Sequence, residues 1–222
     1  MFSDNINVQL NEINTFFKIG ISVDNVIFGY QEDRLKVLVI KCNMPPYVGE
    51  WSLLGELVKA NEDLDDAAYR ILHQWTDVED IHLKQVQTFG RVERHPAGRV
   101  VTVAYYSLIK VNENDHGKEK YAHWVDLTQL DSMAFDHLQV LDACLNRLRH
   151  DLMEDPRILR KLIPERFTLS KLQKLYEAIL GKKLDKRNFR KRLLGQNVVL
   201  ETDEVQINVA HRPAKLFSFQ IK

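Results

Sequence analysis

Residues 185–194 carry side chains of the kind that contact nucleic acid. A guanidinium group can bind a guanine edge through two hydrogen bonds, a side-chain amide can do the same for adenine, and lysine neutralises phosphate. At helical spacing Phe189 and Leu193 share one face, and Arg187 and Lys191 share the opposite face. The predicted DNA contacts, with two cations further along the chain, are Lys186, Arg187, Asn188, Arg190, Lys191, Arg212 and Lys215.

The elements around this helix predict a winged helix-turn-helix. A short helix over residues 156–163 precedes a helix that Ser170 and Gln173 open as a capping box and that Gly181 ends. Asp185 is the expected N-cap of the basic helix. Short strands follow, with the sequences NVVLE, VQINVA and KLFSFQ. Helix, turn, helix and hairpin in this order are typical of the winged form.

Charge divides the chain into an acidic front and a basic back. Residues 1–150 hold 15 Lys and Arg against 22 Asp and Glu, and residues 151–222 hold 16 against 9. A compact basic domain most often contacts phosphate, so we predict two domains, residues 1–152 and 153–222. Two alternatives remain open, a basic helix face that is merely solvated and an adaptor that uses the basic region for a protein or RNA partner.

A second informative pattern lies at residues 51–80. An acidic start at residues 63–66 suits the N-terminus of a helix whose apolar positions recur every three or four residues. Those positions are Leu64, Ala67, Ala68, Ile71, Leu72, Trp75 and Val78. Strands rich in β-branched and aromatic residues flank this helix between residues 18 and 124, and a second amphipathic helix over 135–151 closes the domain. The predicted fold class is α+β, a mixed sheet with helices.

This front domain resembles the Nudix fold. The family signature places its first Glu on Glu62 and its Arg on Arg70, which the resemblance implies to be a structural pair. The signature's later glutamates, which hold Mg²⁺ in the family, fall on side chains without a carboxylate: Ile71, Gln74 and Trp75. Glu56, which replaces the leading glycine, and Asp66 lie at the wrong spacing to substitute for them. We therefore expect no catalytic residue, no metal and no cofactor, and a hydrolase with a non-standard metal site is the alternative.

The resemblance extends to the Nudix-related transcriptional regulators. It rests on the stretches TFGRVERHPAGRVVTVAYYSLI and LDKRNFRK and on the terminal HRPAKLF. It implies a homodimer that binds a double-stranded DNA operator and whose affinity changes when a metabolite fills the former substrate pocket. Members of the family respond to ADP-ribose or to sugars such as arabinose.

For the effector, the residues favour a sugar. A pocket without metal ligands has lost its means of neutralising a diphosphate, and Glu56 would repel phosphate but accept hydrogen bonds from sugar hydroxyls. The predicted effector contacts are Trp51, Glu56, Trp75, Arg94 and Arg99. The predicted function is therefore a repressor of carbohydrate catabolism that responds to L-arabinose. An ADP-ribose-responsive regulator of NAD metabolism is the alternative.

Composition excludes several other classes. With 222 residues, 45% of them hydrophobic, the chain can bury a core. No apolar run has membrane-spanning length and the first residues lack the features of a secretion signal, so we expect a cytoplasmic protein without a membrane partner. Cys42 and Cys144 form no C-x-x-C pair and the eight histidines show no metal-binding spacing.

Overall fold

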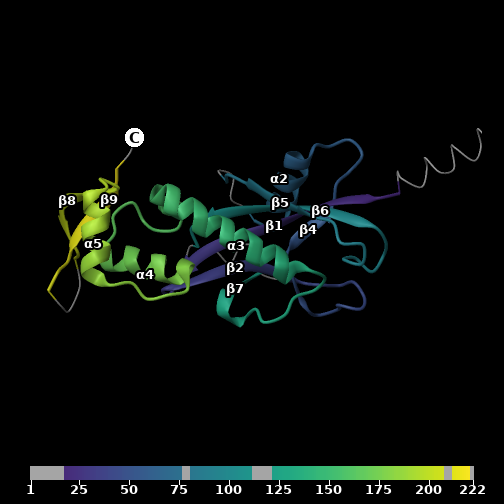
Figure 1. Ribbon diagram of the computed structural model, residues 1–222, viewed down its shortest axis with the longest axis horizontal. Coiled ribbons are helices and arrows are strands. Elements are labelled where there is room, and N and C mark those ends of the chain that lie inside the picture. Colours follow the sequence, from purple (N-terminus) through teal and green to yellow (C-terminus); the bar gives the residue numbers. More distant parts are fainter. Residues whose placement is uncertain (1–17, 77–80, 112–121, 208–211, 221–222) are drawn as a thin grey trace, which may run out of the picture.

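The computed structural model describes residues 18–76, 81–111, 122–207 and 212–220. Its centre is a seven-stranded mixed sheet with helices on both faces, and a small domain with a helix-turn-helix and a hairpin lies at one end of the long axis (Figure 1). The α+β prediction is confirmed. None of the described helices combines the length and the apolar composition that crossing a bilayer requires.

The central strand of the sheet is β1, Gly20–Gln31. Along one edge it pairs in parallel with β6, and along the other it pairs antiparallel with β4 near its start and with β2 near its end. β5 extends the sheet beyond β6, while β3 and β7 pair with β2. The bounds are β2 (Arg34–Lys41), β3 (Trp51–Ser52), β4 (Leu54–Leu57), β5 (Lys84–Phe89), β6 (Val100–Ile109) and β7 (Ala122–Asp126).

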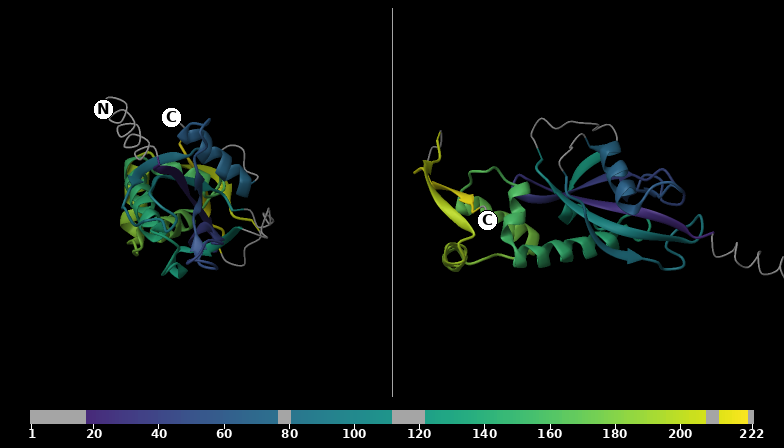
Figure 2. Two further views of the ribbon diagram at one scale, coloured as in Figure 1. Left: turned by 90° about the vertical axis from the view of Figure 1, so that its right-hand side faces the viewer. Right: turned by 90° about the horizontal axis from the view of Figure 1, so that it is seen from above.

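Two helices cover opposite faces of this sheet (Figure 2). Alternate residues of β1 point to opposite sides, so Val23 packs beneath α2 (Leu64–Trp75) and Val26 packs beneath α3 (His137–Glu154). The predicted apolar stripe of α2 is confirmed where it is fully buried, at Ala67, Ala68, Ile71 and Leu72. Its last predicted member, Val78, lies outside the described residues.

The second domain follows two short 3₁₀ helices, η1 (Leu127–Gln129) and η2 (Pro156–Lys161). Its elements are α4 (Leu169–Leu180), α5 (Lys186–Gly195), β8 (Val199–Val205) and β9 (Lys215–Phe219). The two strands form an antiparallel hairpin behind α5. Phe167 forms a single bridge to Phe217 of β9, which ties the segment before α4 to the hairpin.

Two details of this domain differ from the prediction. The N-cap of α4 is Thr168 instead of Ser170, because the Thr168 hydroxyl accepts the Lys171 amide, and Gln173 bonds the Leu184 carbonyl across the turn. VQINVA does not begin a separate strand, because β8 continues through residues 202–204. There the Thr202 hydroxyl donates to the Leu216 carbonyl at 2.9 Å and holds the segment in the hairpin despite a shift in register.

α3 joins the two domains. One continuous core cluster runs from Phe28 on the sheet through Leu148 of α3 to Leu193 of α5. Arg149 of α3 donates to the Ile179 carbonyl at the end of α4 at 2.8 Å, and Lys174 of α4 pairs with Asp33 of the β1–β2 turn at 2.5 Å. The predicted division between residues 152 and 153 falls inside α3 and stays a prediction.

Candidate functional site

The loop before α2 is held by an ion network centred on Arg70. Its Nε and Nη2 donate to Glu62 at 2.9 and 2.8 Å, and its Nη1 donates to Glu56 at 2.5 Å. The Lys59 amide also donates to Glu62, at 2.8 Å. These hydrogen bonds lower the pKa of Glu62 to about 2, and the bond from Arg70 makes the largest contribution. Glu56 is therefore ion-paired within the protein, and it shares the single charge of Arg70 with Glu62.

This network predicts a pH dependence of stability. A carboxyl group whose pKa is lowered by folding stabilises the protein above its ordinary pKa of 4.5, and this contribution disappears as the pH falls towards 2. In urea unfolding at a series of pH values, we expect wild type to exceed Glu62→Gln in stability at neutral pH. The difference should shrink steadily between about pH 5 and about pH 2. Glu93→Gln, at an exposed position, is the matched control for the removal of one carboxylate, and an equal loss of stability in that variant would contradict the assignment to the Arg70 network.

The positions of the family's metal ligands do not assemble carboxylates. Ile71 is fully buried in the core beneath α2, Trp75 packs against the same core, and Gln74 is exposed. Asp65, in the first turn of α2, accepts a hydrogen bond from the Tyr105 hydroxyl at 2.6 Å. Ile71 and Trp75 offer no oxygen ligand, and Gln74 offers only a neutral amide oxygen where Mg²⁺ prefers carboxylates.

The structure does not bring the five predicted effector residues together. Glu56 and Trp75 lie on the α2 side of the sheet, whereas Trp51 and Arg94 lie on the α3 side. The Lys41 ammonium lies 3.4 Å above the centre of the Trp51 ring. Because the sheet separates them, Trp51 and Trp75 cannot line the same pocket. Arg99 donates to the carbonyls of residues 90 and 91, at 2.8 and 2.9 Å, and so closes the β5–β6 loop.

Arg94 belongs to a buried charge cluster at the start of α3. Its side chain is 2% exposed. Its Nε and Nη2 donate to Asp136 at 3.0 and 2.7 Å, and Nη2 also donates to Asp24 at 3.3 Å. Gly55 faces Asp24 on the neighbouring strand, and a Cβ there would lie 2.0 Å from the Asp24 carboxylate, so only glycine leaves room for the cluster. Sequence analysis missed Asp24 and Asp136, although a lone aspartate in the apolar strand β1 signals a buried partner.

His137, the first residue of α3, extends this cluster to the sheet. Its Nδ1 accepts the Leu53 amide at 3.0 Å, so its proton lies on Nε2, which is 3.6 Å from Asp24. Burial lowers the pKa of His137 and keeps the ring neutral near pH 7. The N-terminus of α3 is thereby bonded to the segment between β3 and β4 and lies close to Asp24 of β1.

A half-buried aromatic cluster lies beside the charge cluster, where three loops meet. The Phe135 ring stacks on His95 with centres 5.1 Å apart and planes 4° apart, and it lies 4.8 Å from the Tyr47 ring. Phe135 has a φ of 56°, a left-handed conformation that is costly for a bulky side chain and that is often found at functional sites. We call these three residues the aromatic platform. All three side chains are partly exposed.

The basic helix α5 presents its cations to solvent. Phe189 and Leu193 are buried, and the Phe189 ring meets Tyr176 of α4 edge-on with centres 5.0 Å apart. Asp185 caps the helix by accepting the Asn188 amide at 2.8 Å, as predicted. The predicted DNA contacts of this helix, Lys186, Arg187, Asn188, Arg190 and Lys191, form a set of exposed residues, and Arg192 is exposed as well. The four cations in this set form no ion pair with any residue that the structure describes, so their charge is available to phosphate.

The turn and hairpin position this helix. Glu177 of α4 accepts the Leu184 amide at 3.0 Å, and this bond is the main reason why the pKa of Glu177 falls to about 2. The carboxylate thus fixes the turn between α4 and α5. In the hairpin, Lys215 pairs with Glu201 across the strands, while Arg212 lies exposed near the tip. Sequence reasoning did not single out Glu177 or Glu201.

The chain is similar to known proteins over nearly its whole length. Residues 19–144 match the family described as "NUDIX domain", and residues 159–219 match the family described as "NrtR DNA-binding winged helix domain". The chain is 35% identical to the "ADPR responsive transcriptional repressor NtrR" of Acinetobacter baylyi, over 90% of this chain and 82% of the relative. The predicted Nudix-like sheet and winged helix are confirmed.

Two solved structures of a Shewanella oneidensis protein extend the comparison. NrtR complexed with a 27mer DNA is 29% identical, with a TM-score of 0.75 over 90% of this chain and 93% of that one. The NUDIX domain of the same protein complexed with ADP ribose is 29% identical, with a TM-score of 0.52 over 59% of this chain and 88% of that one.

These relatives overturn the prediction of an arabinose-responsive repressor of carbohydrate catabolism. The repressor from Acinetobacter baylyi and the Nudix domain from Shewanella oneidensis are both described with ADP-ribose. The sugar argument rested on the absence of metal ligands and on a free carboxylate at Glu56 that would repel phosphate. The second premise was wrong because Glu56 is not free: it pairs with Arg70, 14 residues further along the chain.

Proposed function

Because this chain belongs to the family of NrtR-like transcriptional repressors, in which a Nudix domain precedes an NrtR-type winged helix, we propose that it is an ADP-ribose-responsive repressor of NAD metabolism. The observation that carries this proposal is the 35% identity, over 90% of the chain, to a repressor named for its response to ADP-ribose. The similarity to a DNA complex and to an ADP-ribose complex supports both halves of it.

The DNA half of the proposal assigns operator binding to α5. Its exposed cations and Asn188 would enter the major groove, and the hairpin with Arg212 and Lys215 would contact the backbone. A homodimer would place two such helices on a pseudo-palindromic operator, since two-fold symmetry in the protein matches two-fold symmetry in the site.

The effector half places the adenine ring of ADP-ribose on the aromatic platform. Base–aromatic stacking needs a flat, partly exposed ring, and Phe135 and His95 supply one. The platform adjoins Asp136 and His137, which anchor α3. α3 has 18 residues, about 27 Å at the helical rise of about 1.5 Å per residue, and ends at the second domain. Contacts at the platform are thus connected by one rigid helix to the domain that binds DNA.

Fluorescence anisotropy on DNA from upstream of the protein's own and neighbouring genes tests the proposal. We expect tight binding at fixed salt that ADP-ribose weakens by about tenfold or more and that L-arabinose leaves unchanged, because an inducing ligand must bind the DNA-incompetent state more tightly. Binding no tighter than to random DNA, or an operator affinity that ADP-ribose does not change, contradicts the proposal.

Replacing Phe135 by alanine tests the location of the effector. We expect ADP-ribose affinity to fall by about tenfold, since stacking on a base contributes about 1–3 kcal/mol. Operator affinity without effector should stay at the wild-type value. Tyr69→Ala is the matched control, because Tyr69 is also a half-buried aromatic residue stacked on a histidine, His73, but it belongs to α2 on the other face of the sheet. An equal loss in both variants would refute the platform as the binding site.

The same proposal makes the Nudix domain a sensor that does not turn over its ligand. Ile71, Gln74 and Trp75 supply no carboxylate for a metal, and hydrolysis would destroy the signal. Incubation with ADP-ribose and Mg²⁺, followed by measurement of released AMP, should give no product above background. Metal-dependent release of AMP would instead establish a hydrolase with a non-standard site.

A further inference from the structure

We propose that a cavity at the junction of the two domains binds a small organic anion, at a site separate from the aromatic platform. The cavity has a volume of about 550 Å³, within the range of sites for small molecules. It is lined by β5 and β6 of the sheet, by the last turn of α3, by η2, and by Gln220 after β9. A ligand here would contact both domains at once.

Most of the charged side chains around the cavity are paired with one another, but one arginine is available to bind a ligand. Asp151, the buried carboxylate of its wall, already accepts hydrogen bonds from Lys84 at 2.8 Å, Arg147 at 3.0 Å and the Tyr106 hydroxyl. Arg157 pairs in the same way with Asp155, at 2.7 Å. Arg160, by contrast, is exposed at the cavity and forms no ion pair with the residues that the structure describes. A guanidinium in this position favours phosphate or carboxylate.

The rest of the wall selects against a bare inorganic anion. Leu108, Ile158 and the Tyr106 ring give it an apolar portion that an apolar or aromatic body would fill. Gln220 adds a polar side chain to this otherwise apolar part of the wall. The matching ligand has an anionic group on a flat apolar body.

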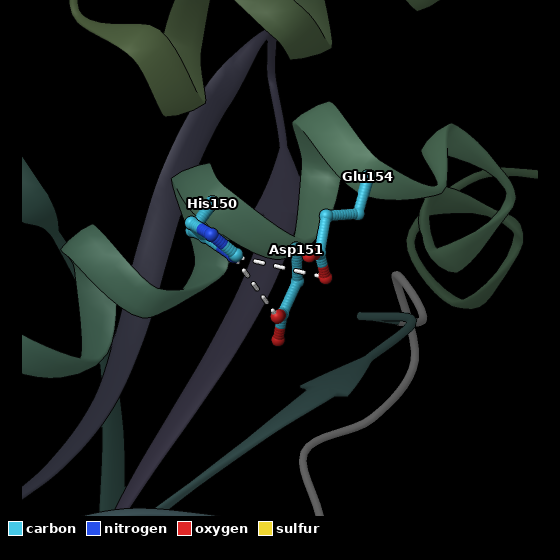
Figure 3. A group of neighbouring side chains, drawn as sticks. All are labelled: His150, Asp151 and Glu154. Carbon is cyan, nitrogen blue, oxygen red and sulfur yellow. Dashed lines mark ion pairs between the residues drawn. The ribbon is translucent and has the colours of Figure 1, made fainter.

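A metal ion fits this location less well. His150, Asp151 and Glu154 lie on the last turn of α3 at the rim, and among the described residues they form the one group of three whose ligand atoms approach within 4.8 Å (Figure 3). His150 Nδ1 lies 3.9 Å from Asp151 and 3.7 Å from Glu154. Both Asp151 oxygens, however, already accept bonds from neighbours, two of them cationic. A metal would have to displace these bonds and would experience their charge.

Isothermal titration calorimetry with simple probes tests the site. Phenyl phosphate and benzoate carry the anion on an aromatic body, while inorganic phosphate and phenol supply each part alone. We expect the two complete probes to bind the full-length protein at one site per chain. Arg160→Ala should weaken that binding by about tenfold or more, because a charge-assisted hydrogen bond is lost, and Ile158→Trp should abolish it by filling the cavity.

Arg91→Ala is the matched control, since it removes an exposed arginine from the far end of β5 and β6. It should bind the probes as wild type does. Retained operator binding shows that Ile158→Trp is folded, and Arg160→Ala at an exposed position gives a second, independent test.

Equal affinity of wild type and Arg160→Ala for the probes, or inorganic phosphate binding as tightly as phenyl phosphate, overturns the proposal. Tighter binding of phenyl phosphate than of benzoate assigns the site to phosphorylated compounds, and the reverse order assigns it to carboxylates.

Discussion

Replacing Arg187 and Lys191 together by alanine should abolish specific operator binding and leave ADP-ribose binding unchanged. Both side chains are exposed on α5, and neither forms an ion pair within the described part of the chain. Their removal therefore leaves no carboxylate without its cation. A bidentate arginine contact to a base contributes about 1–3 kcal/mol, and a lysine at phosphate contributes through counterion release. The combined loss of operator affinity should be about 100-fold or more.

The measurement is anisotropy on the operator at several salt concentrations, with calorimetry of ADP-ribose binding alongside. If Arg187 reads a base and Lys191 contacts phosphate, Arg187→Ala should relax specificity, whereas Lys191→Ala should weaken binding to all sequences and reduce the salt slope by about one. A double variant of exposed cations on the other domain, Arg91→Ala with Lys110→Ala, is the control. Wild-type operator affinity in the α5 variant would exclude α5 as the recognition helix, and loss of both activities would indicate misfolding.

Replacing Arg94 by alanine should destabilise the protein by about 3–5 kcal/mol, because it leaves two aspartates buried without their cation. The Asp24 and Asp136 side chains are 5% and 8% exposed, so water cannot replace the guanidinium. The loss should appear as a lower urea midpoint. Arg99→Ala is the matched control in the same loop: its partners are two backbone carbonyls at the surface, and its cost should stay near 1 kcal/mol or below, i.e. about the value of an ordinary hydrogen bond.

A rescue experiment separates this explanation from a simple loss of packing. If unpaired charge is the cause, adding Asp24→Asn and Asp136→Asn to Arg94→Met should recover a large part of the stability, since the triple variant buries no net charge. If the triple variant is no more stable than Arg94→Met alone, the charge explanation fails. In that case the contribution of Arg94 lies in the volume it fills between the sheet and the start of α3.

The basic helix was determined by the sequence alone. Its two faces depend only on the spacing of Phe189, Leu193, Arg187 and Lys191 along one helix, and helical geometry is the same in any fold. Its N-cap, Asp185, is likewise a local interaction, three residues from the amide that it accepts. The neighbouring helix was less well predicted because Thr168 and Ser170 are both good caps, and the packing of Phe167 against the hairpin selected Thr168.

The lack of carboxylates at the positions of the family's metal ligands could also be seen in the sequence, because the identity of a residue does not depend on the fold. What the sequence did not determine was the charge that Glu56 presents to a ligand. That charge depends on Arg70, which the fold brings across the loop from another element. The preference for a sugar relied in part on a free Glu56, and that part of the argument failed for this reason.

Only the tertiary structure decided which residues share a site. Trp51 and Trp75 look equivalent in sequence but are separated by the sheet, because the strand between them buries one face against α2 and the other against α3. Arg94 meets Asp24 and Asp136 across separations of 70 and 42 residues, for which no local pattern exists. Sequence spacing determines contacts within one helix or one strand, whereas contacts between elements depend on strand order and register, and these are set by the packing of the whole sheet.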